Sequence, residues 1–275
     1  MANAPVPTKP LKILMLHGYT QSGPLFRAKT RALEKNLNKA FPGGVTLSYP
    51  TAPIRLSPAQ IPGWDTDGVS KDDVKDNEQP DAWGWWVRKG DGVPFVYEGM
   101  EEGFAKVADV IKAEGPFDGV IGFSQGAAAA GMIVSLLEPG RKEAFDEHQK
   151  HGGMPYPDAL LKSGHPPFKF AASYSGFAPS DNDLYTAFYE PKIQTPMLHV
   201  LGSLDTVVEE SRSLRLSNAC AKSEGRVIYH PGGHFLPSSQ KQYVAALVGF
   251  IREVMAEAEG NVKKEESAED MDLPF

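Results

Sequence analysis

Short apolar runs alternate with longer amphipathic segments along most of this chain. Runs with the length and composition of buried strands lie at 11–16, 45–49, 168–174, 196–201 and 226–230, and a further one directly precedes Gly122. Segments with helical spacing of apolar residues lie between them, at 22–40, 97–113, 125–137, 209–223 and 239–257. This alternation predicts an α/β protein, with a mostly parallel central sheet that carries helices on both faces.

The stretch 115–130 carries the clearest chemical motif. A buried strand leads directly into Gly122-Phe-Ser-Gln-Gly126, and a helix rich in alanine follows. Glycines two residues before and after Ser124 allow a sharp, strained turn that lifts the hydroxyl out at the top of a sheet. Free amides at the start of the helix, Gln125's among them, would stabilise an oxyanion. The alternative is a tight turn with a capping serine, and the strand before and helix after favour a nucleophile.

A second oxyanion donor is predicted at the end of strand 11–16. This strand runs directly into His17-Gly18-Tyr19, and a loop of this kind directs a backbone amide at a substrate carbonyl. The amide of Tyr19 would then act beside that of Gln125. A glycine-rich turn that caps the next helix at Ser22 is the competing interpretation.

An acid and a base follow two later strands. Asp205 lies in the loop after strand 196–201, where a carboxylate can orient a histidine, whereas Asp118 precedes its strand and belongs at the opposite edge. His234 lies in a Gly-Gly loop beyond strand 226–230, where an imidazole can reach both a carboxylate and a serine. The other six histidines occupy the oxyanion loop, strands or a polar insertion: His17, His148, His151, His165, His199 and His230. The order Ser124, Asp205, His234 is that of the α/β-hydrolase triad.

Aromatic residues suggest where an acyl chain would bind. Three of the four tryptophans, Trp83, Trp85 and Trp86, lie within 81–87. Together with Phe177 and Phe235 they would form an apolar pocket for medium or long acyl chains. The tryptophans could equally anchor a long loop onto the core, and the sequence leaves both interpretations open.

These blocks resemble the FSH-type serine hydrolases of fungi and other eukaryotes, within the α/β-hydrolase superfamily. The resemblance extends from Leu11 to about Ile251 and is most specific at 115–126 and 230–237. It implies an α/β-hydrolase fold, with Ser124 as nucleophile, His234 as base and Asp205 as orienting acid. It also implies carboxylesterase activity on a small-molecule ester, and some fungal relatives resemble stand-alone thioesterases that release polyketide or acyl chains. The chain departs from the family around 71–80 and 141–167, which affects substrate choice.

Composition narrows the classes of partner. The net charge of −7 and the lack of a basic patch argue against nucleic acid. Cys220 is the only cysteine, so no internal disulfide can form. The first ten residues lack the apolar run of a secretory signal, and no segment has membrane-spanning length, so we expect a cytoplasmic protein. No metal and no cofactor is expected.

We expect one domain over 11–257, with insertions at about 51–82 and 139–167, a flexible leader over 1–10 and a mobile acidic tail over 258–275. A protein partner for the tail is possible, although nothing in the sequence supports one. A ligand-binding protein of the same fold with an idle triad is the main alternative to an enzyme.

Overall fold

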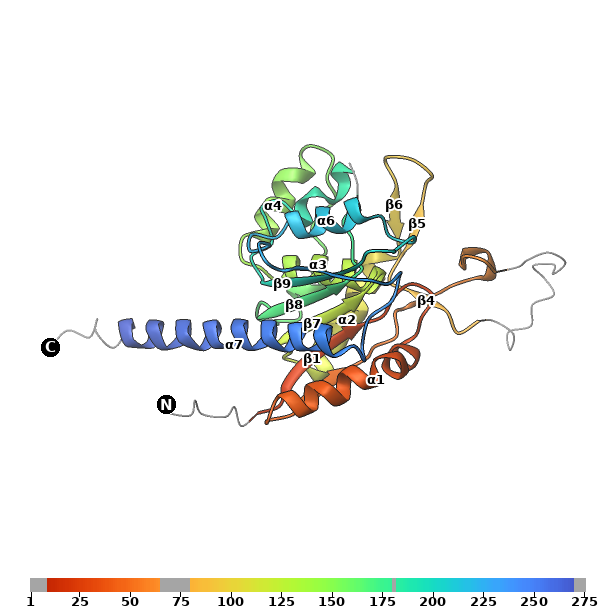
Figure 1. Cartoon of the computed structure of the whole chain (residues 1–275). Coiled ribbons are helices and arrows are strands. Elements are labelled where there is room, and N and C mark those ends of the chain that lie inside the picture. Colours follow the sequence, from red (N-terminus) through yellow and green to blue (C-terminus); the bar gives the residue numbers. More distant parts are fainter. Residues whose placement is uncertain (1–8, 65–79, 180–181, 270–275) are drawn as a thin grey trace.

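A computed structural model describes residues 9–64, 80–179 and 182–269, and its centre is a six-stranded sheet (Figure 1). The strand order is β10-β9-β8-β7-β1-β2, and every neighbouring pair is parallel. The strands are β1 (Leu11–Leu16), β2 (Val45–Ser48), β7 (Gly119–Phe123), β8 (Phe170–Tyr174), β9 (Met197–Gly202) and β10 (Val227–His230). The predicted α/β class with a parallel central sheet is therefore confirmed.

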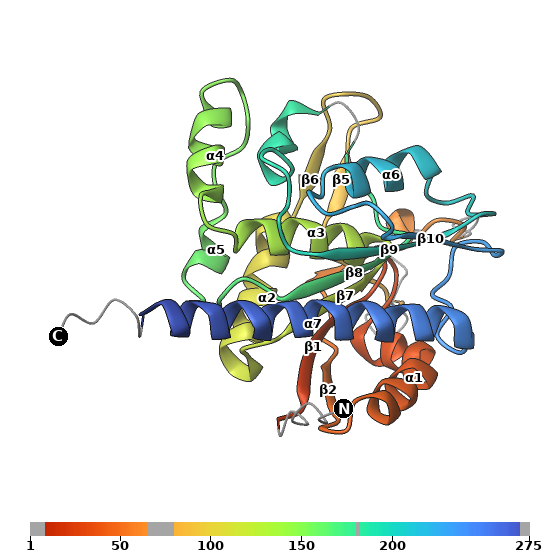
Figure 2. The ribbon, with the colours of Figure 1, turned by 60° about the vertical axis from the view of Figure 1, so that its left-hand side comes forward.

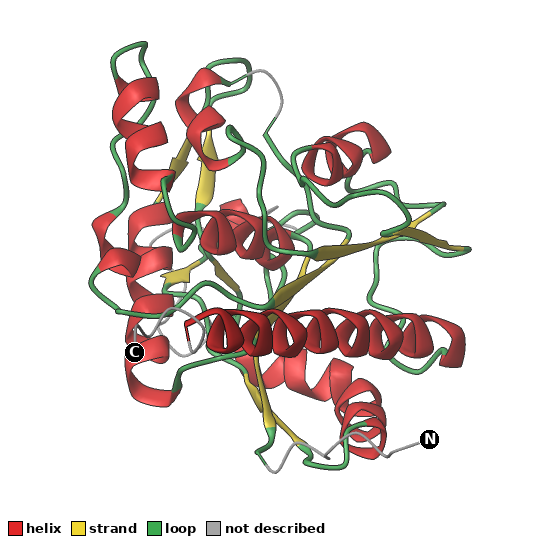
Figure 3. Cartoon of the chain, turned by 90° about the vertical axis from the view of Figure 1, so that its left-hand side faces the viewer, coloured by secondary structure: helices red, strands yellow, loops and turns green. Residues whose placement is uncertain are grey.

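Alternate side chains of the central strands feed two separate cores. In β1, Ile13 and Met15 pack on one face, and Leu14 and Leu16 pack on the other. The first face is covered by α1 (Gly23–Ala40) and α7 (Lys241–Glu269). The second is covered by α2 (Met100–Glu114), α3 (Gln125–Leu136) and α6 (Glu210–Asn218), so that helices lie on both sides of the sheet (Figures 2 and 3). None of the helices in the described ranges is long and apolar enough to cross a membrane.

The two predicted insertions contain short elements that the sequence pattern did not show. The first holds β3 (Ile54–Arg55) and a 3-10 turn (Pro58–Gln60). Directly after it come β4 (Trp83–Gly84), which pairs with β3, and a hairpin of β5 (Val87–Lys89) and β6 (Val96–Glu98). The second holds α4 (Arg141–Gln149) and α5 (Asp158–Leu161), and a 3-10 helix (Asp183–Phe188) lies further on. The helix expected over 97–113 begins at Met100, because 96–98 pair as β6.

Both predicted ends lie partly outside the described residues. The leader is described only from residue 9, and the tail only as far as residue 269. Helix α7 continues through Glu269, twelve residues beyond the predicted end of the last helix at 257. The domain limits and the mobility of the tail stay predictions.

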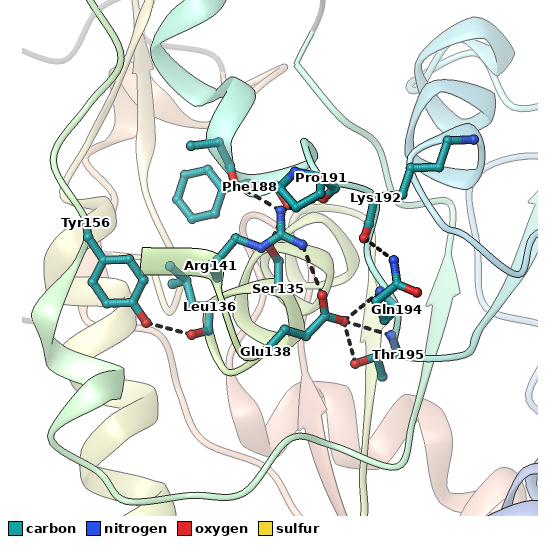
Figure 4. A network of polar contacts seen from close by, with 11 residues as sticks. Ser135, Leu136, Glu138, Arg141, Tyr156, Phe188, Pro191, Lys192, Gln194 and Thr195 are labelled. Carbon is teal, nitrogen blue, oxygen red and sulfur yellow. Dashed lines mark hydrogen bonds and ion pairs between the residues drawn. The ribbon is translucent and has the colours of Figure 1, made fainter. Parts of the chain in front are cut away.

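A buried ion pair joins the end of α3 to the segment before β9 (Figure 4). Arg141 Nη2 lies 3.0 Å from Glu138 Oε2, and both side chains are almost fully buried. The other Glu138 oxygen accepts the amides of Gln194 and Thr195 and the Thr195 hydroxyl, at 2.7 to 2.8 Å. Arg141 Nη1 donates to the carbonyls of Ala187 and Pro191. One carboxylate and one guanidinium therefore fix a long connection that has little regular structure of its own.

Glu138→Ala should destabilise the protein by about 3–5 kcal/mol, because it leaves the Arg141 cation buried and unpaired. Urea unfolding followed by tryptophan fluorescence measures this change. Asp146→Ala is the matched control, since it removes the exposed pair with Lys142 on α4, the helix that begins at Arg141. This control should have little effect on stability. Equal effects of the two substitutions would contradict a structural role for the buried pair.

Candidate active site

Ser124 lies at the corner between β7 and α3, in a backbone conformation that few residues adopt. Its φ is 53° and its ψ is −120°. A Cβ on Gly122 would collide with the backbone of Gly126 and Ala127, and one on Gly126 would collide with the carbonyl oxygens of Leu16 and His17. Only glycine fits at these two positions, and their close packing holds Ser124 in its strained geometry.

The side chains of Ser124, His234 and Asp205 form one chain of hydrogen bonds. His234 Nε2 lies 2.9 Å from Ser124 Oγ, and His234 Nδ1 lies 2.7 Å from Asp205 Oδ2. The loops after β9 and β10 that carry the acid and the histidine are themselves joined, because the Leu204 amide donates to the Gly232 carbonyl at 3.0 Å. Three side chains from distant parts of the sequence thus meet at the carboxyl edge of the sheet.

Asp205 is held in its ionised form. Burial opposes the charge, but the amide of Val208, the imidazole of His234 and the amide of Val207 all donate to the carboxylate, and together they lower its pKa. Because an ionised carboxylate has no hydrogen to donate, Nδ1 of His234 carries the proton of their shared hydrogen bond. Nε2 is then free to accept the hydrogen of the Ser124 hydroxyl.

The backbone amides of Tyr19 and Gln125, which both lie near Ser124, have no acceptor within the described parts of the chain. The neighbouring amides of Gly18 and Thr20 are both used, by Gln21 Oε1 and by the Trp83 carbonyl. Unpaired amides at the start of α3 and in the loop after β1 are the kind of donors that an oxyanion hole requires. The structure leaves free the two amides that the sequence pointed to.

The Gln125 side chain has a role that the sequence did not indicate. Its Oε1 accepts the Trp85 amide and its Nε2 donates to the Trp86 carbonyl, both at 2.8 Å. The Trp85 indole in turn donates to the His17 carbonyl at 2.9 Å. The tryptophan segment is therefore tied to both loops that carry the free amides. No local pattern could reveal this, since the partners are about 40 residues apart.

His17 supports the loop after β1 as a neutral side chain. Its Nε2 accepts the Ala52 amide at 2.9 Å, so Nδ1 carries the hydrogen and donates to the Gly18 carbonyl at 2.8 Å. Burial lowers its pKa from 6.5 to about 4, although the hydrogen bond to Gly18 and the charge of Asp81 act in the opposite direction. Protonation would destroy the contact with Ala52.

Stability should therefore fall as the pH drops from about 6.5 towards 4. The unfolded state binds a proton at His17 in this range and the folded state does not, so the loss reaches about 3 kcal/mol at and below pH 4. Urea unfolding from pH 7.5 to 4 should show a shallower pH dependence for His17→Asn than for the unsubstituted protein. His151→Asn, at an exposed site, should keep the original dependence. An unaltered pH dependence in His17→Asn would show that the imidazole is not buried in its neutral form.

The residues predicted to line an acyl pocket lie in different environments. Trp85 and Trp86 are 1% and 2% exposed and belong to the core, which favours the anchoring interpretation for them. Trp83 is half-buried, and its indole donates to Asp81. Phe177 packs at the edge of the core, with the Arg212 guanidinium over its ring. Phe235 is 41% exposed and follows His234 directly.

Phe235 also lines a cavity of about 310 Å³ that reaches His234 from the side of α1. A smaller cavity of about 190 Å³ lies behind Asp205. Within the described residues, no three His, Cys, Asp or Glu side chains are placed to hold a metal ion.

A parallel sheet with a strained serine after a central strand, and with a histidine and a carboxylate after later strands, defines an α/β-hydrolase. The family model described as "Serine hydrolase (FSH1)" matches residues 6–246, and the chain belongs to this family. The resemblance drawn from the sequence motifs is thus confirmed.

Similar proteins include both short and long chains. "Family of serine hydrolases 3" of Saccharomyces cerevisiae is 32% identical over 268 residues, which are 96% of this chain and 92% of that protein. "Esterase OVCA2" of Danio rerio is 34% identical and covers 84% of this chain and 92% of its own. A protein of Schizosaccharomyces pombe named "Dihydrofolate reductase" is 32% identical over 89% of this chain, which spans only 47% of its length.

A solved structure supports the fold. Acyl-protein thioesterase 2 of Zea mays matches 90% of this chain and 96% of its own, with a TM-score of 0.53 and 20% identity.

Proposed function

We propose that this protein is a carboxylesterase that cleaves esters of medium or long acyl chains through Ser124, His234 and Asp205. The observation that carries the proposal is the continuous chain of hydrogen bonds from Asp205 through His234 to the Ser124 hydroxyl. It supplies a nucleophile, a base and a group that orients the base, beside two unpaired amides. Membership of a serine hydrolase family supports the same chemistry.

The reaction follows from these positions. His234 Nε2 removes the hydroxyl proton while Ser124 Oγ attacks the acyl carbon, and the Asp205 carboxylate stabilises the imidazolium that forms. The carbonyl oxygen becomes an oxyanion that accepts from the amides of Tyr19 and Gln125. Protonated His234 then donates to the leaving oxygen, and the acyl-enzyme forms. Water, deprotonated by the same imidazole, releases the acid and restores the hydroxyl.

Apolar side chains around the triad favour a hydrocarbon acyl group. Leu204 and Val207 are 68% and 65% exposed in the loop that carries Asp205, and exposed Phe235 follows His234. The hydrogen bond between Leu204 and Gly232 brings these two loops together. Exposed apolar side chains gathered beside a catalytic site provide a surface for acyl chains of medium or greater length.

A thioester is the second candidate substrate. The attacking and protonating groups would be the same, and the maize structural neighbour is named as an acyl-protein thioesterase. A panel of matched hexanoyl and decanoyl esters and thioesters decides between the two classes. Cytoplasmic location and a small-molecule substrate, with no nucleic acid partner, stay predictions from the sequence.

Ser124→Ala should reduce hydrolysis of 4-nitrophenyl hexanoate to the background rate and abolish labelling by a fluorophosphonate probe, because Ser124 Oγ is the hydroxyl that contacts His234 Nε2 among the described residues. Release of 4-nitrophenol and in-gel fluorescence measure the two effects. Ser203→Ala is the control, since this exposed serine lies two residues from Asp205 and donates only to the His230 carbonyl. Full turnover in Ser124→Ala would refute the proposed mechanism.

Asp205→Asn should lower kcat by about 10³ to 10⁴-fold, because the amide neither stabilises the imidazolium nor fixes the hydrogen on Nδ1 of His234. Steady-state kinetics with the same ester measure the loss, which should fall on kcat and leave KM nearly unchanged. Glu209→Gln, a substitution at an exposed carboxylate in the same loop, should keep normal activity. A loss of less than tenfold in Asp205→Asn would assign the orienting role to another group.

A further inference from the structure

The cavity of about 310 Å³ beside His234 lies between helix α1 and the segment that follows β10, which are far apart in the sequence. Phe123 and His234 form its inner wall, and their rings lie 4.9 Å apart. Phe235 and Leu236 continue this wall, and α1 closes the opposite side with Phe26 and Lys29. The Ser238 hydroxyl donates to the Lys29 carbonyl at 3.0 Å, so α1 is attached to the segment that follows His234. The cavity is thus a fixed feature of the active-site rim.

Its position determines which half of a substrate it receives. In the proposed mechanism, the carbonyl oxygen points to the amides of Tyr19 and Gln125, and the leaving oxygen points to His234 Nε2, which protonates it. A cavity that has the His234 ring as a wall therefore lies on the leaving-group side. The acyl chain extends away from it, over Leu204 and Val207 in the loop of Asp205, and Phe235 lies between the two halves of the substrate. This assignment rests on the proposed function.

The cavity has a charge character unlike that of the whole chain. The protein carries a net charge of −7, yet no acidic side chain among the described residues lines this cavity. Lys29 is the cation that lines it, is exposed to solvent, and has no ion-pair partner among the described residues. Its α1 neighbour Arg27, in contrast, pairs with Glu34 at 3.3 Å. An unpaired ammonium group beside an apolar wall suits a small group that combines hydrocarbon with an anion.

We propose that this cavity binds an anionic leaving group and that Lys29 selects it. The substrates would be esters or thioesters whose alcohol or thiol carries a carboxylate or a phosphate a few bonds from the scissile bond. The cavity volume of about 310 Å³ corresponds to about ten water molecules at about 30 Å³ each, so the cavity accommodates a group of about ten non-hydrogen atoms. Phe123, Phe235 and Leu236 contact its hydrocarbon part, and Lys29 contacts its anion. Lys29 is a specificity-determining residue and takes no part in the bond-breaking step.

The experiment compares leaving groups that differ in a single anion. One pair is 4-nitrophenyl hexanoate and the hexanoate ester of 5-hydroxy-2-nitrobenzoate, which adds a carboxylate. The other is 1-hexanoylglycerol and 1-hexanoylglycerol 3-phosphate, which adds a phosphate. In the unsubstituted enzyme, at least one anionic member should have a kcat/KM about two- to fivefold above its neutral partner, which is the ratio expected of one exposed ion pair. The preference should shrink as NaCl rises from 20 to 500 mM. The pair that shows it identifies the anion as carboxylate or phosphate.

Three variants assign the preference to one side chain. Lys29→Met should remove the anionic preference by raising KM for the anionic substrate to that of its neutral partner, both measured in the same variant. Lys29→Glu should reverse it. Lys35→Met, at an exposed lysine on the same helix, should leave it intact and thereby controls for the net charge of the protein.

The possible outcomes separate this inference from the proposed function. Ser124-dependent turnover of the neutral esters, without an anionic preference or with a preference that persists in Lys29→Met, overturns the role of Lys29 and leaves the esterase assignment standing. Absence of turnover of all four substrates overturns both. A preference for the anion that Lys29→Met removes and Lys35→Met retains supports the proposal.

Discussion

The close packing of the first turn of α3 against the end of β1 is the contact on which the active site depends. Gly126 lies directly on the carbonyl oxygens of Leu16 and His17, at a separation that excludes any side chain. This approach places the turn at Ser124 and the loop after β1 side by side. The same contact therefore positions the nucleophile and the unpaired amides of Tyr19 and Gln125. The strained φ of Ser124 persists because the packing around it permits no relaxation.

The free amides impose a second constraint, which explains several buried polar side chains. An amide that is to serve an oxyanion must stay unpaired, so the loop that carries it cannot be stabilised through that amide. Side chains supply the missing hydrogen bonds: Gln21 to the Gly18 amide, His17 between Gly18 and Ala52, and Gln125 to the tryptophan segment. Each is a neutral group that satisfies backbone polar atoms without bringing a second charge beside the triad.

Whether a residue's position in the site could be predicted from the sequence depends on whether a local sequence pattern determines that position. Ser124, Asp205 and His234 follow buried apolar strands, and parallel strands bring their carboxyl ends to one edge, so their meeting could be predicted from order alone. Trp85 could not be assigned in the same way, because a tryptophan in a core and one in a pocket have the same local sequence. The two- and three-residue strands β3 to β6 are too short to show any periodicity. The Gln125 contacts join segments about 40 residues apart, and only the folded chain reveals them.

The arrangement also separates chemistry from recognition. The positions of the triad and of the free amides depend on the ends of the strands and on the close contacts of Gly122 and Gly126 around Ser124. Substitution there alters the geometry of the reaction itself. The leaving-group cavity draws its cation from Lys29, an exposed position on α1 that contacts none of the catalytic hydrogen bonds. A helix that packs through Phe26, Leu33 and Leu37 can change its exposed residues at little cost to its fold. Selection among leaving groups can therefore vary at Lys29 while the turn that carries Ser124 stays constant. Members of this family with the same triad need not share a substrate.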